Sequence, residues 1–266
     1  MFALRRALHA ICVAAMVGAA PVLADVWDLD PFSEDDSADT DNQLIHGARQ
    51  VHDLASQGGV ADQDWYLFAN RPYSSYEAIV EGLTGTLYAT GLPVDHIAAN
   101  GTSVLGSAQN GPGGLPTSRS LRIVNSGPTA GSDFIRVLGT TTACGTTCTT
   151  NDQYSIRFYE TTGSIPRYNQ SGTQVTVVIL QSIVDASQID GTVRYWNGVG
   201  NLVASTTFTV LPRNTIVLAT PVAANGTSGA ITIDHNGRFG DLQGKGVALE
   251  PATGFSFDSP LTYRPQ

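Results

Sequence analysis

The feature that most constrains the fold is the stretch Gly59–Phe68, in which a glycine turn leads into an alternating run of bulky side chains. Side chains of a β-strand alternate between its two faces, so Trp65 and Leu67 share one face and Tyr66 and Phe68 share the other. The stretch therefore predicts a strand, and no reactive set of side chains accompanies it.

The composition favours the same kind of structure along the whole chain. Of the 266 residues only 14% are charged, whereas 28 are Gly and 13 are Pro; an average soluble domain has roughly 25% charged residues. Few charges with many turn formers are typical of short strands joined by tight turns. The net charge of −9 disfavours contact with phosphate backbones, so nucleic acid is not expected as a partner.

Strand-like runs recur without a long helical pattern, which predicts an all-β protein of two consecutive antiparallel β-sandwich domains. The first domain is expected over 42–163. The second is expected over 164–266, as an immunoglobulin-like sandwich, because six or seven short strands fit into about 100 residues. The main runs are 76–81, 119–124, 133–138 and 153–159 in the first domain, and 174–183, 191–197, 202–211, 215–219, 230–234 and 246–249 in the second.

Two local patterns give further expectations. The dipeptide Asn236-Gly237 predicts a β-hairpin, because these residues tolerate the positive φ values of a two-residue turn. Large aromatic side chains within strand-like runs are most simply core residues; these are Trp65, Tyr66, Phe68, Trp196 and Phe208.

The N-terminus resembles a secretory signal. Arg5 and Arg6 precede an apolar stretch that ends at Ala24 and is too short for a comfortable membrane span. Residues 1–24 are therefore expected to be a signal peptide. The mature protein would be secreted or periplasmic, with no stable membrane insertion after signal cleavage. The next segment, 25–41, carries eight acidic side chains and no basic one, which predicts a disordered leader. The alternative is that its end, Asp39-Thr-Asp-Asn42, folds back on Asp62 and Asp64, where the carboxylates could hold calcium.

After signal removal two cysteines remain, Cys144 and Cys148. In an exported protein two nearby cysteines most simply form one disulfide. It would close a loop between the runs 133–138 and 153–159, which is expected to be a hairpin tip.

A family resemblance joins several of these segments. Asp39-Thr-Asp-Asn42, Asp62-Gln-Asp-Trp-Tyr-Leu-Phe68, 75–80 and 152–157 occur in an order that resembles the bacterial pre-peptidase C-terminal domain over about 39–160. The resemblance implies a jelly-roll-like β-sandwich that accompanies exported proteins. Some members bind calcium, and the equivalent residues here would be Asp39, Asp41, Asn42, Asp62 and Asp64. The second half resembles uncharacterised immunoglobulin-like C-terminal β modules of exported bacterial proteins, including the run Pro251–Asp258.

Sequence motifs for nucleotide binding, for a Gly-x-Ser-x-Gly nucleophile and for a His-Glu-x-x-His metal site are absent. We therefore expect a non-enzymatic binding or accessory protein of the bacterial cell envelope or exterior, with calcium as the one candidate cofactor. Its partner would be an extracellular or envelope protein or a glycan. An exported hydrolase with a dispersed active site and a carbohydrate-binding module that uses exposed aromatic residues are the alternatives.

Overall fold

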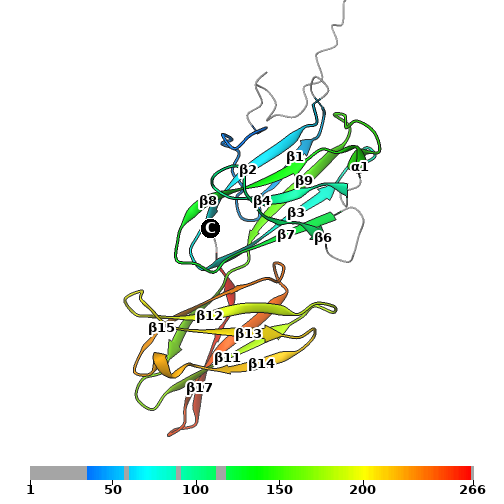
Figure 1. The fold of residues 1–266 in the computed structure, drawn as a ribbon. Helices are drawn as coiled ribbons and strands as arrows, with labels where there is room; N and C mark the ends of the chain where they lie inside the picture. Colours follow the sequence, from blue (N-terminus) through cyan, green and yellow to red (C-terminus); the bar gives the residue numbers. More distant parts are fainter. Residues whose placement is uncertain (1–34, 57–59, 88–90, 112–117, 265–266) are drawn as a thin grey trace, which may run out of the picture.

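The computed structural model describes residues 35–56, 60–87, 91–111 and 118–264. Within these ranges the protein is all-β, as expected, and its strands form four antiparallel sheets. Figure 1 shows the sheets arranged as two sandwiches, one above the other. The expected signal peptide and residues 25–34 of the acidic segment lie outside the described residues.

The first sandwich pairs a five-stranded sheet, in the order β1-β9-β3-β7-β6, with a four-stranded sheet, β2-β8-β4-β5. Its elements are β1 (Arg49–Asp53), β2 (Gln63–Asn70), β3 (Ser74–Gly82), β4 (Val94–Ile97), β5 (Val104–Ser107), β6 (Gln109–Asn110), β7 (Ser118–Asn125), β8 (Gly131–Leu138), α1 (Thr141–Cys144) and β9 (Gln153–Glu160).

The second sandwich pairs the sheet β13-β12-β15-β10-β18 with the sheet β14-β11-β16-β17. Its elements are β10 (Gly163–Asn169), β11 (Val175–Ser182), β12 (Ile189–Asn197), β13 (Leu202–Val210), β14 (Thr215–Ala219), η3 (Val222–Ala224), β15 (Ser228–His235), β16 (Leu242–Glu250), β17 (Phe255–Pro260) and β18 (Thr262–Tyr263). The chain passes from one sandwich to the other between β9 and β10.

Strand β2 follows the alternation that the sequence predicts. Tyr66 and Phe68 are buried in the main core of the first sandwich. Trp65 lies on the opposite face, in a smaller apolar cluster with Ile97 and Phe134. Both faces of β2 are therefore covered, which explains why bulky residues occupy consecutive positions.

Residues 35–41, expected to belong to the disordered leader, are folded against β2. The Trp65 amide donates to the Asp35 carbonyl at 2.6 Å, and the Gln63 side chain donates to the Asp36 carbonyl at 3.0 Å. Asp35 and Thr40 are buried. Edge-strand backbone groups need hydrogen-bond partners, and this segment supplies them to β2 despite its acidic composition.

The expected hairpin at Asn236-Gly237 is wrong. Strand β15 pairs with β10 and β12, whereas the next strand, β16, pairs with β11 and β17 in the other sheet. The connection crosses between sheets, and Asn236 is held there by its side-chain oxygen, which accepts from the Asp190 amide at 2.9 Å. A turn-forming dipeptide thus marks the change of sheet.

Cys144 and Cys148 form the expected disulfide. Their loop also crosses between sheets, from β8 to β9, and is not a hairpin tip. The Thr140 hydroxyl caps the short helix α1 by accepting from the Ala143 amide at 3.1 Å, and both cysteines are buried at the end of the core.

Removing this disulfide should have a modest effect on stability. The double variant Cys144→Ala/Cys148→Ala is expected to lower the free energy of unfolding by about 2 kcal/mol, because the bridge closes a loop of only about five residues. Urea denaturation of oxidised wild type and of the double variant measures the difference. A loss much greater than 4 kcal/mol would mean that the bridge acts mainly on the folded core and not on the unfolded chain.

Candidate functional site

A buried polar cluster lies beside β2, in the region where the sequence predicts calcium ligands. Ligand atoms of Asp35, His52 and Asp64 all lie within 4.8 Å of one another, and the three residues are buried. Nδ1 of His52 lies 3.5 Å from a carboxylate oxygen of Asp35. Two carboxylates and an imidazole thus converge from the acidic segment, β1 and β2.

Tyrosines complete this cluster. The Tyr154 hydroxyl donates to Asp64 in a short hydrogen bond, and it lies 2.6 Å from the Tyr66 hydroxyl. The His52 ring stacks on Tyr154 and meets Tyr66 edge-on. Burial, reinforced by the negative charge of Asp64, raises the pKa of Tyr154 well above its usual value, so this phenol stays protonated and donates to the carboxylate.

The five calcium ligands that the sequence predicts do not come together at one site in the structure. Asp64 of β2 and Asp62, which precedes the strand, are buried, and so is Asn42, whose carbonyl accepts from the Leu67 amide at 2.8 Å. Asp39 and Asp41 are exposed. Among the described residues, only Asp64 of the five belongs to the cluster of potential ligands, and Asp35 and His52 join it. The imidazole suits zinc and other transition metals better than calcium, which takes oxygen ligands.

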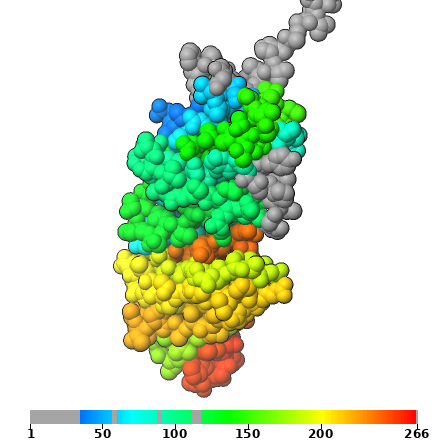
Figure 2. Space-filling model, turned by 45° about the vertical axis from the view of Figure 1, so that its right-hand side comes forward, coloured from blue at the N-terminus to red at the C-terminus, as the bar shows by residue number. Residues whose placement is uncertain are grey.

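A second candidate is the junction between the sandwiches, where the two bodies meet directly (Figure 2). Glu160, at the end of β9, is fully buried and receives the guanidinium groups of Arg71 at 3.3 Å and of Arg264, whose Nε lies at 2.6 Å. On the opposing module, Arg194 of β12 forms an ion pair with Asp234 of β15, and both are buried. Of these pairs, Arg264–Glu160 joins the two sandwiches, whereas Arg71–Glu160 lies within the first and Arg194–Asp234 within the second.

Backbone contacts also cross the junction. The His235 amide donates to the Ser75 hydroxyl at 3.2 Å, and the Phe239 amide donates to the Glu77 carboxylate at 2.8 Å. Burial raises the pKa of Glu77 and lowers that of His235 from 6.5 to about 4. His235 is neutral at pH 7, and its Nδ1 accepts from the Gly237 amide at 3.1 Å.

His235 should make the junction sensitive to acid. Between pH 6.5 and about pH 4 the unfolded chain binds a proton that the folded chain does not, so stability falls as the pH falls through this window. The full loss is about 3 kcal/mol. The raised pKa of Glu77 acts in the opposite direction. We therefore expect His235→Gln to lose less stability than wild type between pH 7 and pH 4.5, as measured by urea denaturation, and equal losses would contradict the assignment.

The junction encloses an open cleft with a cavity volume of about 550 Å³. On one side the cleft is lined by the outer face of the sheet that contains β12 and β15. The residues of this face that line it are Trp196, Ala230 and Thr232. The first sandwich contributes Arg71, Pro72 and Tyr73 from the β2–β3 turn and Pro128 from the β7–β8 turn, and Arg264 completes the lining. The lining is mainly aromatic and apolar, with arginines at its edge.

Trp196 was expected in the core, and that prediction is wrong. Val193 and Tyr195 of β12 enter the core, so Arg194 and Trp196 project from the other face. The Trp196 indole nitrogen donates to the Thr232 hydroxyl at 2.8 Å. A Cβ at Gly229 would collide with the Trp196 carbonyl oxygen, so glycine permits the close pairing of β15 with β12 at this point.

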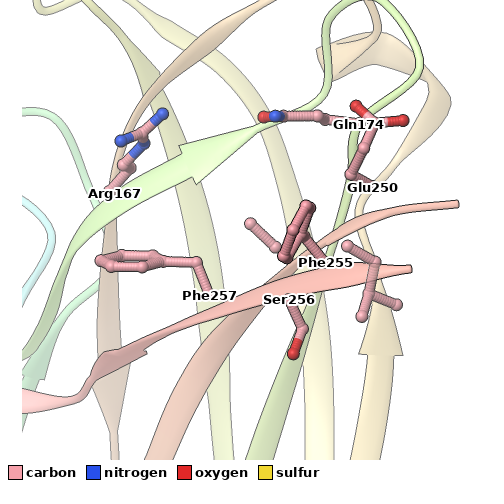
Figure 3. Close-up of a pocket in the computed structure, with 8 residues that line it drawn as sticks. Arg167, Gln174, Glu250, Phe255, Ser256 and Phe257 are labelled. Atoms are coloured by element: carbon pink, nitrogen blue, oxygen red, sulfur yellow. The ribbon is translucent and has the colours of Figure 1, made fainter. Parts of the chain in front are cut away.

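A smaller pocket of about 200 Å³ lies at the far end of the second sandwich, on the β16–β17 hairpin. Phe255 and Phe257 are 77% and 57% exposed, and the Arg167 guanidinium lies 5.9 Å from the centre of the Phe257 ring. Figure 3 shows Arg167 beside Phe257, and Gln174 next to Glu250. This volume is below the usual range of ligand sites, so the pocket is a weaker candidate than the cleft for a ligand of ordinary size.

None of the helices in the part of the chain that the structure describes has the length and apolar character that a membrane crossing requires. Comparison with known proteins finds no matching family model and no matching curated protein. The domain resemblance inferred from sequence therefore stays a prediction.

Comparison with solved structures finds weak similarity to glycoside hydrolases. A β-glucuronidase of glycoside hydrolase family 2 is 12% identical (TM-score 0.19), with 85% of this chain and 26% of that enzyme covered. A family 2 member from Bacteroides cellulosilyticus is 10% identical (TM-score 0.24; 79% and 31% covered). Bacteroides uniformis β-glucuronidase 2 is 10% identical (TM-score 0.19; 81% and 32% covered). The chain spans at most a third of these enzymes, and TM-scores this low support no argument about function.

Proposed function

We propose that this protein is an exported, non-catalytic binding protein whose two β-sandwiches act as one unit and hold a ligand in the cleft between them. The observation that carries the proposal is the position of the cleft between the sandwiches and its lining, which includes Trp196, Tyr73 and Arg71. Ligand sites form preferentially where domains meet, in clefts with apolar walls and a few polar groups. The cleft volume of about 550 Å³ lies within the range of such sites.

Export is supported by the signal-like residues 1–24 and by the disulfide between Cys144 and Cys148. Disulfides persist in oxidising compartments such as the periplasm or the cell exterior. The absence of a motif for enzymatic chemistry in the sequence supports the non-catalytic part of the proposal.

The test uses the chain from residue 25 and follows the indole N–H signals by NMR. A panel of aromatic acids, neutral aromatics and neutral and acidic oligosaccharides is added in turn. We expect at least one class to shift the Trp196 signal while leaving that of Trp65, which is buried in the other sandwich, in place. The same compounds should lose affinity for Trp196→Leu. Compounds that bind without moving the Trp196 signal would place the site elsewhere.

A bound cation is a separate part of the proposal, supported by the convergence of Asp35, His52 and Asp64. A divalent ion there would join the acidic segment to β1 and β2 and would stabilise the first sandwich. The resemblance favours calcium, whereas the imidazole favours a transition metal such as zinc.

The cation is tested by thermal unfolding with EDTA, with calcium and with zinc. At a hundredfold excess over its dissociation constant the bound ion should add about 2.7 kcal/mol to the free energy of unfolding. Asp64→Asn should remove this gain, whereas Asp41→Asn, at an exposed position, should keep it. If calcium stabilises the protein and Asp41→Asn abolishes the effect, the ligand set predicted from sequence is the better one. If neither ion changes the melting temperature, the cation is dropped.

A further inference from the structure

The cleft carries a local positive charge in an acidic protein. Arg71 and Arg264 lie at its edge and share one carboxylate, Glu160, so one positive charge is left over. Arg264 is held by both Glu160 and the Ser74 hydroxyl. The Arg71 side chain is 39% exposed and contacts Glu160 through a single nitrogen at 3.3 Å. Since a guanidinium has five N–H donors, Arg71 retains donors for a ligand.

The aromatic wall of the cleft is held rigidly. Trp196 is fixed by its hydrogen bond to Thr232. Tyr73 has a φ of +52°, a conformation that non-glycine residues rarely adopt, and the Arg194 guanidinium lies 4.5 Å from the centre of its ring. The centres of the two rings are 5.6 Å apart, with their planes at 61°. Residues held in rarely populated backbone conformations are concentrated at functional sites, including ligand sites.

The lining argues against a ligand with many hydroxyl groups. Besides the arginines, the polar groups of the lining are the Tyr73 hydroxyl and the paired Trp196 N–H and Thr232 hydroxyl, which are too few to replace the water around several sugar hydroxyls. Sugar hydroxyls buried against Pro72, Pro128 and Ala230 would lose hydrogen bonds to water without replacement. A flat apolar ring loses nothing there and stacks on aromatic faces.

We propose that the cleft binds a small aromatic carboxylate, with its ring against Trp196 and its carboxylate on Arg71. This inference rests on the proposed function and names the class of ligand. The ring is enclosed by Tyr73, Pro72 and Pro128. The carboxylate receives charge-assisted hydrogen bonds from the guanidinium, whose planar fork matches the two oxygens.

The test compares 2-naphthoate with 2-naphthamide, which has the same ring and no charge, by isothermal titration calorimetry. We expect the acid to bind about tenfold more tightly at low salt, and the preference should shrink in 1 M NaCl because salt screens the charge. Arg71→Gln should remove the preference. Arg213→Gln, at an exposed arginine outside the cleft, should leave it unchanged.

Pro128 offers a second test that leaves the buried junction intact, because this residue is exposed at the rim. Both Pro128→Glu and Pro128→Lys remove the contact of the proline with the ring, so the charge effect is the difference between the two compounds: Pro128→Glu should weaken 2-naphthoate severalfold more than 2-naphthamide, and Pro128→Lys should increase the preference for the acid. Trp196→Leu should weaken both compounds.

The outcomes separate the ligand class from the proposed function. If acid and amide bind equally and Trp196→Leu weakens both, the carboxylate assignment is overturned and the binding cleft stands. The same holds if a neutral oligosaccharide such as cellohexaose shifts the Trp196 signal and 2-naphthoate does not bind. Both proposals fail if no compound of the panel shifts the Trp196 signal and if the Trp196 and Pro128 variants bind 2-naphthoate with the same affinity as wild type.

Discussion

Replacing Arg194 with methionine is expected to lower the free energy of unfolding of the second sandwich by about 3 to 5 kcal/mol. The guanidinium pairs with Asp234, and both side chains are at most 5% exposed. It also donates to the Ser126 carbonyl at 3.3 Å and lies over Tyr73. Removing it leaves the Asp234 carboxylate buried without its countercharge, and that penalty exceeds the value of the contacts themselves.

The double variant Arg194→Met/Asp234→Leu separates these two terms. Replacing a buried ion pair by apolar groups of similar size is often nearly neutral, so the double variant should recover most of the lost stability. Arg213→Met breaks an exposed pair with Asp185 and should have no measurable effect. Urea denaturation followed by circular dichroism measures all three. If the double variant is as unstable as Arg194→Met, the loss comes from the contacts to Ser126 and Tyr73 and not from the stranded carboxylate.

The strands of the two sandwiches were largely predictable because their signals are local. Alternation at 65–68 depends only on neighbouring residues, and the structure places these side chains on opposite faces of β2. The disulfide was predictable for the same reason, since Cys144 and Cys148 are close in sequence. Strand β17, which is exposed at most positions, follows no inside–outside alternation and was not predicted. Six further strands in the described part of the chain were also not predicted: β1, β4, β5, β6, β10 and β18.

The cleft was not predictable, because no local signal joins its parts. Arg71 and Tyr73, Pro128, Trp196 and Arg264 come from four distant segments. Trp196 lies in a strand with bulky residues on both faces, and such a pattern reads as core. Trp196 differs from a core residue because the first sandwich, and not the second sheet of its own sandwich, covers its face of β12. The sequence of one strand contains no information about a neighbouring domain.

The polar cluster of Asp35, His52 and Asp64 was predictable in part. Asp62 and Asp64 were predicted as calcium ligands, and both are buried, but only Asp64 belongs to the cluster of potential ligands. Asp35 was assigned to a disordered leader because it is one of eight acidic residues in the segment 25–41, yet it is buried beside His52. Composition averages over a segment and cannot identify the one carboxylate that has a buried imidazole within reach.

Replacing Phe158 with alanine is expected to lower the free energy of unfolding of the first sandwich by about 3 to 5 kcal/mol. Phe158 on β9 is fully buried. Its ring centre lies 5.3 Å from that of Phe68 and 5.5 Å from that of Tyr76. Phe68 belongs to the opposite sheet, so the three rings join the two layers, and alanine would leave a cavity between them.

Phe257 provides the matched control, because the same substitution there removes a ring that is 57% exposed on β17. Phe257→Ala should change the free energy of unfolding by about 0.5 kcal/mol or less, since it loses only the contact with Arg167. Urea denaturation measures both variants. Phe158→Leu should retain part of the stability, because leucine fills some of the cavity. If Phe257→Ala destabilises the protein as much as Phe158→Ala, the hairpin at the end of the second sandwich is packed against something in solution, such as a second copy of the chain.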